Sequence, residues 1–365
     1  MKFSDYIKRE DPYRVLSYTR LSSAQKKART VNVKFFRKIN IIADSLNKEK
    51  LRIFLLNEYI NHRTGFIKSC AKIYFFWVLP FLTLFNHRKI VVELDENVKN
   101  FFIMLCNQRV RLFDLDRDLV SIFPKAGYSQ LHIEREIAYR NKFTPPLMIP
   151  IIYSEKGMLV EPFLKGIPLA RFGLGSTKSV NAVRVILESY EAFYKTYSFK
   201  YSLDIYLEKL IRKIQTFVPD SLTQEVGQII EALQLSKNKG KTLRVAITHG
   251  DMHHGNIWIC DKIPIIIDWE SIEFRATMYD EFFLLNGIRP PHLITKNYLE
   301  KRKNHIKCFG EKVGSVFDLN DPLNQTVLIM EDLLYRLTEI KKMPFERREM
   351  EYKSIFFNTN GEFGE

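Results

Sequence analysis

The stretch that decides the fold is HGDMHHGN, residues 249–256, together with the residues that follow it. Two short apolar runs come next, IWIC at 257–260 and IPIII at 263–267, and the polar pair Asp261-Lys262 separates them. Short apolar runs joined by a polar pair predict a β-hairpin. The hairpin would bring Asn256, just before its first strand, and Asp268, just after its second, to the same end.

Asp251, Asn256 and Asp268 carry the oxygen atoms that phosphoryl transfer requires. This reaction needs a carboxylate that orients the attacking hydroxyl, and oxygen ligands that hold Mg²⁺ on the phosphates. Asp251 suits the first task, and Asn256 with Asp268 suits the second. Each residue alone is more often an ordinary turn residue, so it is the joint spacing that favours a site.

The same residues resemble a known superfamily, the aminoglycoside phosphotransferases and choline kinases, whose loop reads HGDxxxxN and whose following hairpin ends in DW or DWE. The resemblance implies a protein-kinase-like fold and transfer of the γ-phosphate of ATP, with Mg²⁺, to a hydroxyl group. It implies that Asp251 is the catalytic base, that His249 braces the loop, and that Asn256 and Asp268 bind the metal. It also implies that Asp280 supports the loop from a helix. The resemblance covers about residues 90–340, and its specific motifs lie within 249–280.

Residues upstream match this superfamily less closely. Its members pair a strand lysine with a helix glutamate to hold the nucleotide phosphates. Glu136, within IEREI at 133–137, is expected to be that glutamate. Ser121 stands where the lysine is expected, so Lys125, near the end of the same strand, is the alternative, against the simpler interpretation of an exposed charge. The turn Asn107-Gln108 has no glycine to cover phosphates. These departures concern catalytic competence rather than fold.

The segment VEPFLKG, residues 160–166, resembles the linker between the two lobes of the superfamily, whose backbone binds adenine. Glu161 and Phe163 are therefore expected beside the nucleotide. The alternative is a plain strand end before a glycine turn. The linker is favoured because it falls between a β-rich half and a helical half, where a ligand crevice forms.

Hydrophobic periodicity predicts an α+β fold with two lobes. Short β-type runs give a small antiparallel β lobe at residues 90–163, and helical patterns give a larger helical lobe at 164–345, followed by a tail at 346–365. The expected strands are 90–94, 101–106, 110–115, 119–123, 148–152 and 158–163, and the expected helices are 129–140, 179–199, 203–217 and 222–235.

The first 89 residues are expected to form a basic, mostly helical N-terminal extension, for example at 33–55. Residues 1–90 hold 19 Lys/Arg and 6 Asp/Glu, which gives them +13 of the net charge of +14. An apolar run at 73–85 contains six aromatic residues and is too short to cross a bilayer, which needs about 20 residues. Such a segment favours an anionic membrane surface over nucleic acid as a partner. The alternative is a buried helix.

The cell compartment is expected to be the cytoplasm, with peripheral attachment to the inner face of the membrane. The four cysteines are far apart in sequence, which predicts neither disulfides nor a zinc site. The N-terminus lacks the uninterrupted apolar stretch of a secretory signal.

The function expected from the sequence is therefore an ATP- and Mg²⁺-dependent phosphotransferase that acts on a hydroxyl of a small molecule or glycan, such as a lipid-linked sugar or a surface-polysaccharide precursor. A catalytically weak pseudokinase that serves as a membrane-bound binding module is the first alternative, because of Ser121 and the missing glycines. An antibiotic phosphotransferase is the second. A metal-dependent hydrolase is a further alternative, because the loop contains His249, His253 and His254. The sequence has no second His/Asp cluster that would complete such a site.

Overall fold

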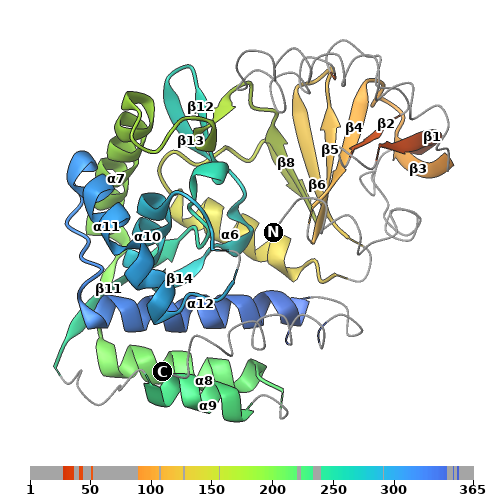
Figure 1. The fold of residues 1–365 in the computed structure, drawn as a ribbon. Coiled ribbons are helices and arrows are strands. Elements are labelled where there is room, and N and C mark those ends of the chain that lie inside the picture. Colours follow the sequence, from red (N-terminus) through yellow and green to blue (C-terminus); the bar gives the residue numbers. More distant parts are fainter. Residues whose placement is uncertain are drawn as a thin grey trace. The chain divides into compact units, whose positions relative to one another are not determined.

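The computed structural model describes residues 28–36, 41–43, 51, 89–106, 108–125, 128–155, 157–219, 223–232, 240–290, 292–342, 348 and 352 (Figure 1). The chain divides into two compact units, Met1–Ile137 with Ile149–Ile167, and Ala138–Met148 with Pro168–Glu365. Antiparallel strands dominate the first unit and helices dominate the second. The expected α+β fold, with a β-rich part before a helical part, is confirmed.

The first unit contains an eight-stranded sheet in the order β3-β1-β2-β4-β5-β6-β8-β7, with antiparallel neighbours. Along the chain, helix α6 (Leu131–Phe143) comes between β6 and β7 and continues into the second unit. Two buried clusters of apolar side chains, one containing Phe102 and the other Phe101, include residues of these strands. The strands are β1 (Ala28–Phe36), β2 (Ile41–Ala43), β3 (Lys89–Asp95), β4 (Phe101–Leu105), β5 (Arg109–Asp114), β6 (Leu119–Pro124), β7 (Tyr153–Glu155) and β8 (Met158–Pro162).

The prediction of helix across residues 33–55 is wrong at residues 33–36 and 41–43, which lie in strands β1 and β2, whereas Leu51, the other described residue of this segment, is helical. β1 pairs with β3 along its length, with Val33 opposite Ile90, and β2 continues the sheet to β4. The segment carries apolar residues at Val31 and Val33 around the polar, exposed Asn32, an alternation with β-branched residues that suits a strand. The sheet therefore begins at residue 28, inside the stretch expected to be a helical extension.

The aromatic run at 73–85 lies outside the described residues, as does most of the basic N-terminal segment. Among the helices that the structure does describe, none has the length and apolarity to cross a bilayer.

The second unit holds two small sheets among its helices. One has the order β10-β11-β14, and β12 pairs with β13 as the predicted hairpin, which is confirmed. Helices α8 and α12 pack against each other (Figure 1). The strands are β9 (Ile167–Pro168, at the junction of the units along the chain), β10 (Phe199–Ser202), β11 (Thr242–Thr248), β12 (Ile257–Cys260), β13 (Ile263–Ile266) and β14 (Glu273–Ala276).

The predicted helices at 129–140, 179–199, 203–217 and 222–235 are confirmed to within a few residues. The helices of the second unit are α7 (Thr177–Tyr197), α8 (Leu203–Phe217), α9 (Thr223–Ala232), α10 (Met278–Asn286), α11 (Lys296–Val313) and α12 (Pro322–Lys342), with single 3-10 turns η3 (Leu169–Arg171), η6 (His254–Asn256) and η7 (Trp269–Ser271).

A buried carboxyl group, that of Glu331, joins α12 to α8 and β14. Its Oε1 accepts a hydrogen bond from the Tyr206 hydroxyl, which in turn accepts one from the Ala276 N–H at 2.9 Å. Burial raises the pKa of Glu331 to about 8, against a smaller opposite effect of the Ala276 N–H. Glu331 is therefore mostly protonated at neutral pH in the folded chain.

Replacing Glu331 by glutamine should make the stability less dependent on pH. Between pH 4.5 and pH 8 the unfolded chain releases this proton while the folded chain keeps it, so the folded state loses relative stability as pH rises. We expect the Tm of Glu331→Gln to exceed that of the parent by a margin that grows from pH 5 to pH 8. The full effect is on the order of a few kcal/mol.

The matched control is Glu188→Gln on the exposed face of α7, which should shift Tm equally little at every pH. A constant difference in Tm between Glu331→Gln and the parent from pH 5 to pH 8 would contradict the raised pKa.

Candidate active site

The loop after β11 is held by the carboxylate of Asp280, in the first turn of α10. Asp280 accepts hydrogen bonds from the backbone N–H groups of His249, at 2.6 Å, and Gly250, at 2.8 Å. Burial raises the pKa of Asp280, and these two N–H groups with His249 oppose the rise. Gly250 has φ +81°, and a Cβ there would lie 2.4 Å from the Arg275 guanidinium and 2.5 Å from the Ser271 carbonyl oxygen. Only glycine fits this turn without displacement of its neighbours.

His249 connects the loop to the end of the hairpin. Its Nδ1 accepts a hydrogen bond from the Asp251 N–H at 3.1 Å, and its Nε2 lies 2.8 Å from the Ile267 carbonyl oxygen. Because a carbonyl can only accept, Nε2 carries the proton. The ring also meets the buried Trp269 edge-on, with 4.7 Å between centroids. Both nitrogens are therefore committed to holding the backbone.

Asn256 lies between the loop and the hairpin. Its Nδ2 donates to the Asp251 carbonyl oxygen at 3.0 Å and lies 3.4 Å from Asp251 Oδ2. Its backbone carbonyl accepts from the Ile267 N–H at 2.9 Å. The amide nitrogen is thus turned to Asp251, which leaves Oδ1 as the atom of Asn256 that suits a cation.

Asp268 follows the second hairpin strand in a left-handed conformation, with φ +64°. The hairpin places Ile257 opposite Ile266, so Asn256 and Asp268 come to the same end, as predicted. At the other end Asp261 and Lys262, with φ +48° and +71°, form the tight turn. Positive φ is uncommon for a residue other than glycine, and such strain is often found at functional sites.

Arg289, which the sequence did not point to, lies against Asp251. Its Nη1 is 2.8 Å from Asp251 Oδ1, and its Nη2 is 3.2 Å from Asp332 Oδ1. The guanidinium carbon lies 3.7 Å from the ring centroid of Tyr335 and 4.8 Å from that of Phe283. Burial raises the pKa of Asp251, but Arg289 and His253 together outweigh it, so this pKa lies below its usual value. Asp251 is therefore a carboxylate at neutral pH.

Replacing Arg289 by methionine should destabilise the second unit. The side chain of Asp332 is fully buried. After the substitution its remaining ion pair among the described residues is with Arg336, at 2.8 Å. Removing one partner of a buried pair costs about 3–5 kcal/mol, and the retained Arg336 places the expected loss near the lower value. Urea unfolding followed by circular dichroism measures it.

The control for this experiment is Arg212→Met on the exposed face of α8, which should cost well under 1 kcal/mol. Equal midpoints for the two variants would show that the Arg289 contacts add nothing to stability.

The residues expected beside the nucleotide belong to the first unit. Glu136 Oε2 lies 2.6 Å from Nη2 of Arg109, at the start of β5, and both side chains are buried. Lys125 is also buried, directly after β6, and its N–H donates to the Gln108 carbonyl oxygen at 2.9 Å. Arg109 was not expected here from the sequence. Ser121 lies within β6 and is half-buried.

Glu161 lies near the end of β8, and Phe163 directly follows that strand. Glu161 is buried opposite Val120, and the Phe163 N–H donates to the Asp118 carbonyl oxygen at 2.7 Å. The Phe163 ring meets Phe113 edge-on at 5.6 Å.

The donor set of Asn256 and Asp268 fits Mg²⁺. This ion typically takes one or two protein oxygen groups and completes its coordination with phosphates and water. The three histidines suit a transition metal poorly, because His249 and His254 both face backbone carbonyls with Nε2. Within the part of the chain that the structure describes, no three His, Cys, Asp or Glu side chains are grouped to hold a metal. The contacts of His249 and His254 with backbone carbonyls argue against the histidine metal site of a hydrolase.

Comparison with known proteins gives similar structures only. No protein-family model and no curated protein matches the chain. Similar solved structures include the choline kinase LicA from Streptococcus pneumoniae (13% identity, TM-score 0.44, covering 68% of this chain and 88% of that one). A choline/ethanolamine kinase family protein from Mesorhizobium loti (13%, 0.46, 82% and 95%) and the GDP complex of aminoglycoside 2'-phosphotransferase-IIIa (12%, 0.46, 80% and 97%) are also similar. These are the two groups of proteins that the sequence motif resembles. At these identities and scores, the function proposed below rests on the side chains and not on this similarity.

Proposed function

We propose that the chain is a phosphotransferase that moves the γ-phosphate of ATP to a hydroxyl group, with Asp251 as catalytic base and Asn256 and Asp268 as ligands of Mg²⁺. The observation that carries the proposal is the fixed arrangement of these three residues. Asp280 and His249 hold the loop by its backbone, and Asn256 bonds to Asp251 directly. A protein-kinase-like fold accompanies this proposal.

Asp251 would accept a hydrogen bond from the acceptor hydroxyl and take its proton as the bond to phosphorus forms. Its pKa lies below the usual value, so the carboxylate is ready at neutral pH but is a weak base. A weak base is sufficient, because phosphoryl transfer depends mainly on positioning and on electrostatic stabilisation. Mg²⁺, when bound by Asn256 and Asp268, would neutralise charge on the phosphates.

The nucleotide would be held by residues of the first unit. Lys125 and Glu136 are proposed at the phosphates, and Glu161 and Phe163 at the adenine. Arg109 is added to this set, because it is a buried cation at the start of β5 that the Glu136 carboxylate holds in place.

The acceptor is proposed to be a small molecule or glycan presented at a membrane, such as a lipid-linked sugar or a surface-polysaccharide precursor. The support is the charge of +13 in residues 1–90 and the aromatic run at 73–85, which lies within the same segment. Residues 1–89 would then hold a cytoplasmic protein on the inner face of the membrane. Flotation with anionic and neutral vesicles, at low and high salt, tests this part separately, and failure to float with anionic vesicles at low salt would refute it.

Ser121 favours a second candidate, a pseudokinase that binds ligands with little turnover. It stands within β6, where the lysine is expected. The antibiotic phosphotransferase remains a third candidate on the loop motif alone.

A turnover assay with Mg·ATP tests the first proposal against the other two. Phosphate transfer would be followed across sugars, lipid-linked glycans, choline and aminoglycosides. Transfer to a sugar or glycan supports the proposal, and transfer only to aminoglycosides supports the third candidate. Nucleotide binding without transfer to any acceptor supports the pseudokinase.

A further inference from the structure

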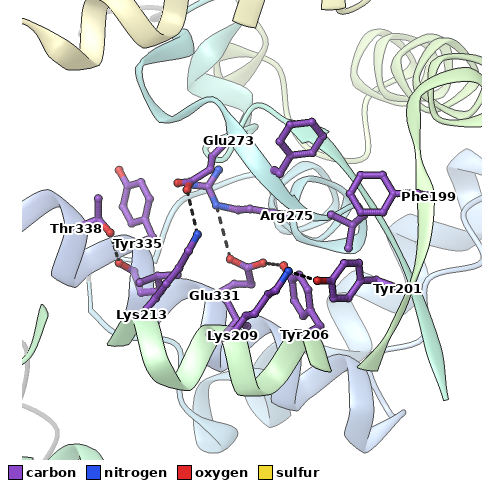
Figure 2. A pocket seen from close by; sticks show the side chains of 14 residues that line it. Phe199, Tyr201, Tyr206, Lys209, Lys213, Glu273, Arg275, Glu331, Tyr335 and Thr338 are labelled. Carbon is purple, nitrogen blue, oxygen red and sulfur yellow. Dashed lines mark hydrogen bonds and ion pairs between the residues drawn. The ribbon is translucent and has the colours of Figure 1, made fainter. Parts of the chain in front are cut away.

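A cavity of about 170 Å³ lies in the second unit, between helices α8 and α12 and the sheet β10-β11-β14 (Figure 2). Its walls come from one unit, and they hold none of the residues that the proposed function uses. It is therefore a separate site that needs its own explanation.

Aromatic rings form much of its wall, namely Phe199, Tyr201, Tyr206, Phe274 and Tyr335. Phe199 and Phe274 lie with their ring centroids 5.9 Å apart, and Tyr201 and Tyr206 lie 6.0 Å apart. An engineered apolar cavity of about 150 Å³ in another protein holds benzene, so the volume here suits one six-membered ring. Aromatic faces with hydroxyl groups suit a ring that has both apolar faces and polar substituents.

Two lysines one helical turn apart on α8 supply positive charge at the rim. Lys209 donates to the Tyr201 hydroxyl and lies 4.6 Å from the centroid of that ring. Lys213 lies 3.5 Å from Glu273 Oε1, and its side chain is 54% exposed. Long, exposed ammonium side chains can turn to a ligand at low cost. They differ in this from the buried Arg275, which donates to the Ser271 carbonyl oxygen at 2.7 Å.

Negative charge in the wall is weaker than positive charge. Glu273 lies 3.5 Å from both Lys213 and Arg275, so it is already neutralised. Glu331 Oε2 lies 3.7 Å from Arg275 Nε, and burial raises the pKa of this carboxyl group to about 8, which weakens its negative charge at neutral pH. The three cations of the wall therefore outnumber its two carboxyl groups, which favours an anion over a cation.

The cavity is connected to the proposed catalytic base by two contacts. Tyr335 lines the cavity, and its ring centroid lies 3.7 Å from the guanidinium carbon of Arg289. Arg289 Nη1 lies 2.8 Å from Asp251 Oδ1. The Tyr335 ring and the Arg289 guanidinium thus lie between the cavity and the carboxylate, which places the cavity near the proposed catalytic base.

We propose that this cavity binds one ring of the acceptor, and that this ring carries a carboxylate or similar anionic group which Lys209 and Lys213 hold. An acidic sugar within a longer glycan has this chemistry. The proposal rests on the proposed function, to which it adds the class of acceptor.

The test compares two sugars that differ only at one carbon, galacturonate and galactose, with choline as a cationic probe. Binding to the full chain is measured by calorimetry for the parent, for the double variant Lys209→Gln with Lys213→Gln, and for Arg212→Gln. Arg212 is the matched control because it is an exposed cation on the same helix outside the cavity. We expect galacturonate to bind the parent and Arg212→Gln equally and the double variant at least about 10-fold more weakly, since the double variant removes both charge-assisted contacts to the carboxylate.

Galactose should bind more weakly than galacturonate and should be insensitive to the lysine changes. Equal binding of the two sugars, preference for choline, or no effect of the double variant overturns the proposal. The Tyr201→Leu variant provides a second measurement, since it should weaken both sugars if the ring stacks in this cavity.

Turnover of Mg·ATP, measured on the same samples, separates this proposal from the proposed function. If phosphate is transferred to some acceptor but galacturonate binding does not depend on the lysines, the proposed phosphotransferase function stands and the proposed acidic ring in the cavity is wrong. If galacturonate binding depends on the lysines but no acceptor is phosphorylated, the proposed phosphotransferase function is wrong. The cavity then binds an acidic ring but is not an acceptor site.

Discussion

Replacing Asp251 by asparagine is expected to lower phosphate transfer by about 10²–10⁴-fold, the usual contribution of a general base, while folding and nucleotide binding stay nearly intact. The amide keeps the shape of the side chain, and its oxygen can still accept from Arg289, which lies 2.8 Å from Oδ1. The bond from Asn256 to the Asp251 backbone carbonyl, at 3.0 Å, is not touched by the change. What is lost is the negative charge that orients the hydroxyl and receives its proton.

Three measurements check this result: turnover with the best acceptor, titration with Mg·ATP, and thermal unfolding. Asp318→Asn serves as control because it removes an exposed carboxylate far along the chain from the loop. A turnover within a few-fold of the parent would remove Asp251 from the role of base. A large fall in Tm would instead show that its pairing with Arg289 is structural.

The hairpin and the loop were predictable because local chemistry determines both. A polar pair between two apolar runs predicts a tight turn, and Asp261 and Lys262 adopt the positive φ values that such a turn requires. Once the hairpin forms, the positions of Asn256 and Asp268 follow from the register alone. The sequence places Gly250 in the loop. It does not explain why a glycine is needed there, because the close approach of Arg275 depends on the position of strand β14.

Arg289 and Arg109 could not be predicted, because their partners are distant in sequence and carry no periodic signal. Arg289 pairs with Asp251 and Asp332, which precede and follow it by some forty residues. Arg109 pairs with Glu136, and strand β6 and the start of helix α6 lie between these two residues in the sequence. A chain with 56 Lys and Arg offers many candidates for each carboxylate, so charge alone does not select one.

Strand β1 was missed for a related reason. A strand is stabilised by its neighbours in the sheet, and β1 pairs with β3, far along the chain, with Val31 opposite Val92. Apolar residues spaced by three and four also occur beyond the strand, and they favoured a helical interpretation of the whole segment. Tertiary pairing overrode that weak local preference.

Replacing Asp268 by alanine is expected to weaken Mg²⁺-dependent nucleotide binding by at least about 10-fold and to remove turnover. Asp268 would supply the charged ligand of the metal, and replacing even a residue that only supports a metal ligand typically costs about 10–100-fold. Its backbone complicates the experiment, because φ is +64° and alanine in this region costs roughly 1–2 kcal/mol. The expected loss must therefore be separated from strain.

Asp261→Ala separates the two effects. Asp261 lies in the same hairpin, at the opposite end from Asp268, and it also has positive φ, at +48°, so alanine there brings a similar strain without loss of a proposed ligand. We expect both variants to unfold at lower temperature, and only Asp268→Ala to lose the dependence of ATP binding on Mg²⁺ in a titration with and without the ion. Equal ATP affinities for the two variants in Mg²⁺ would make Asp268 a turn residue, and the metal site would then need another carboxylate.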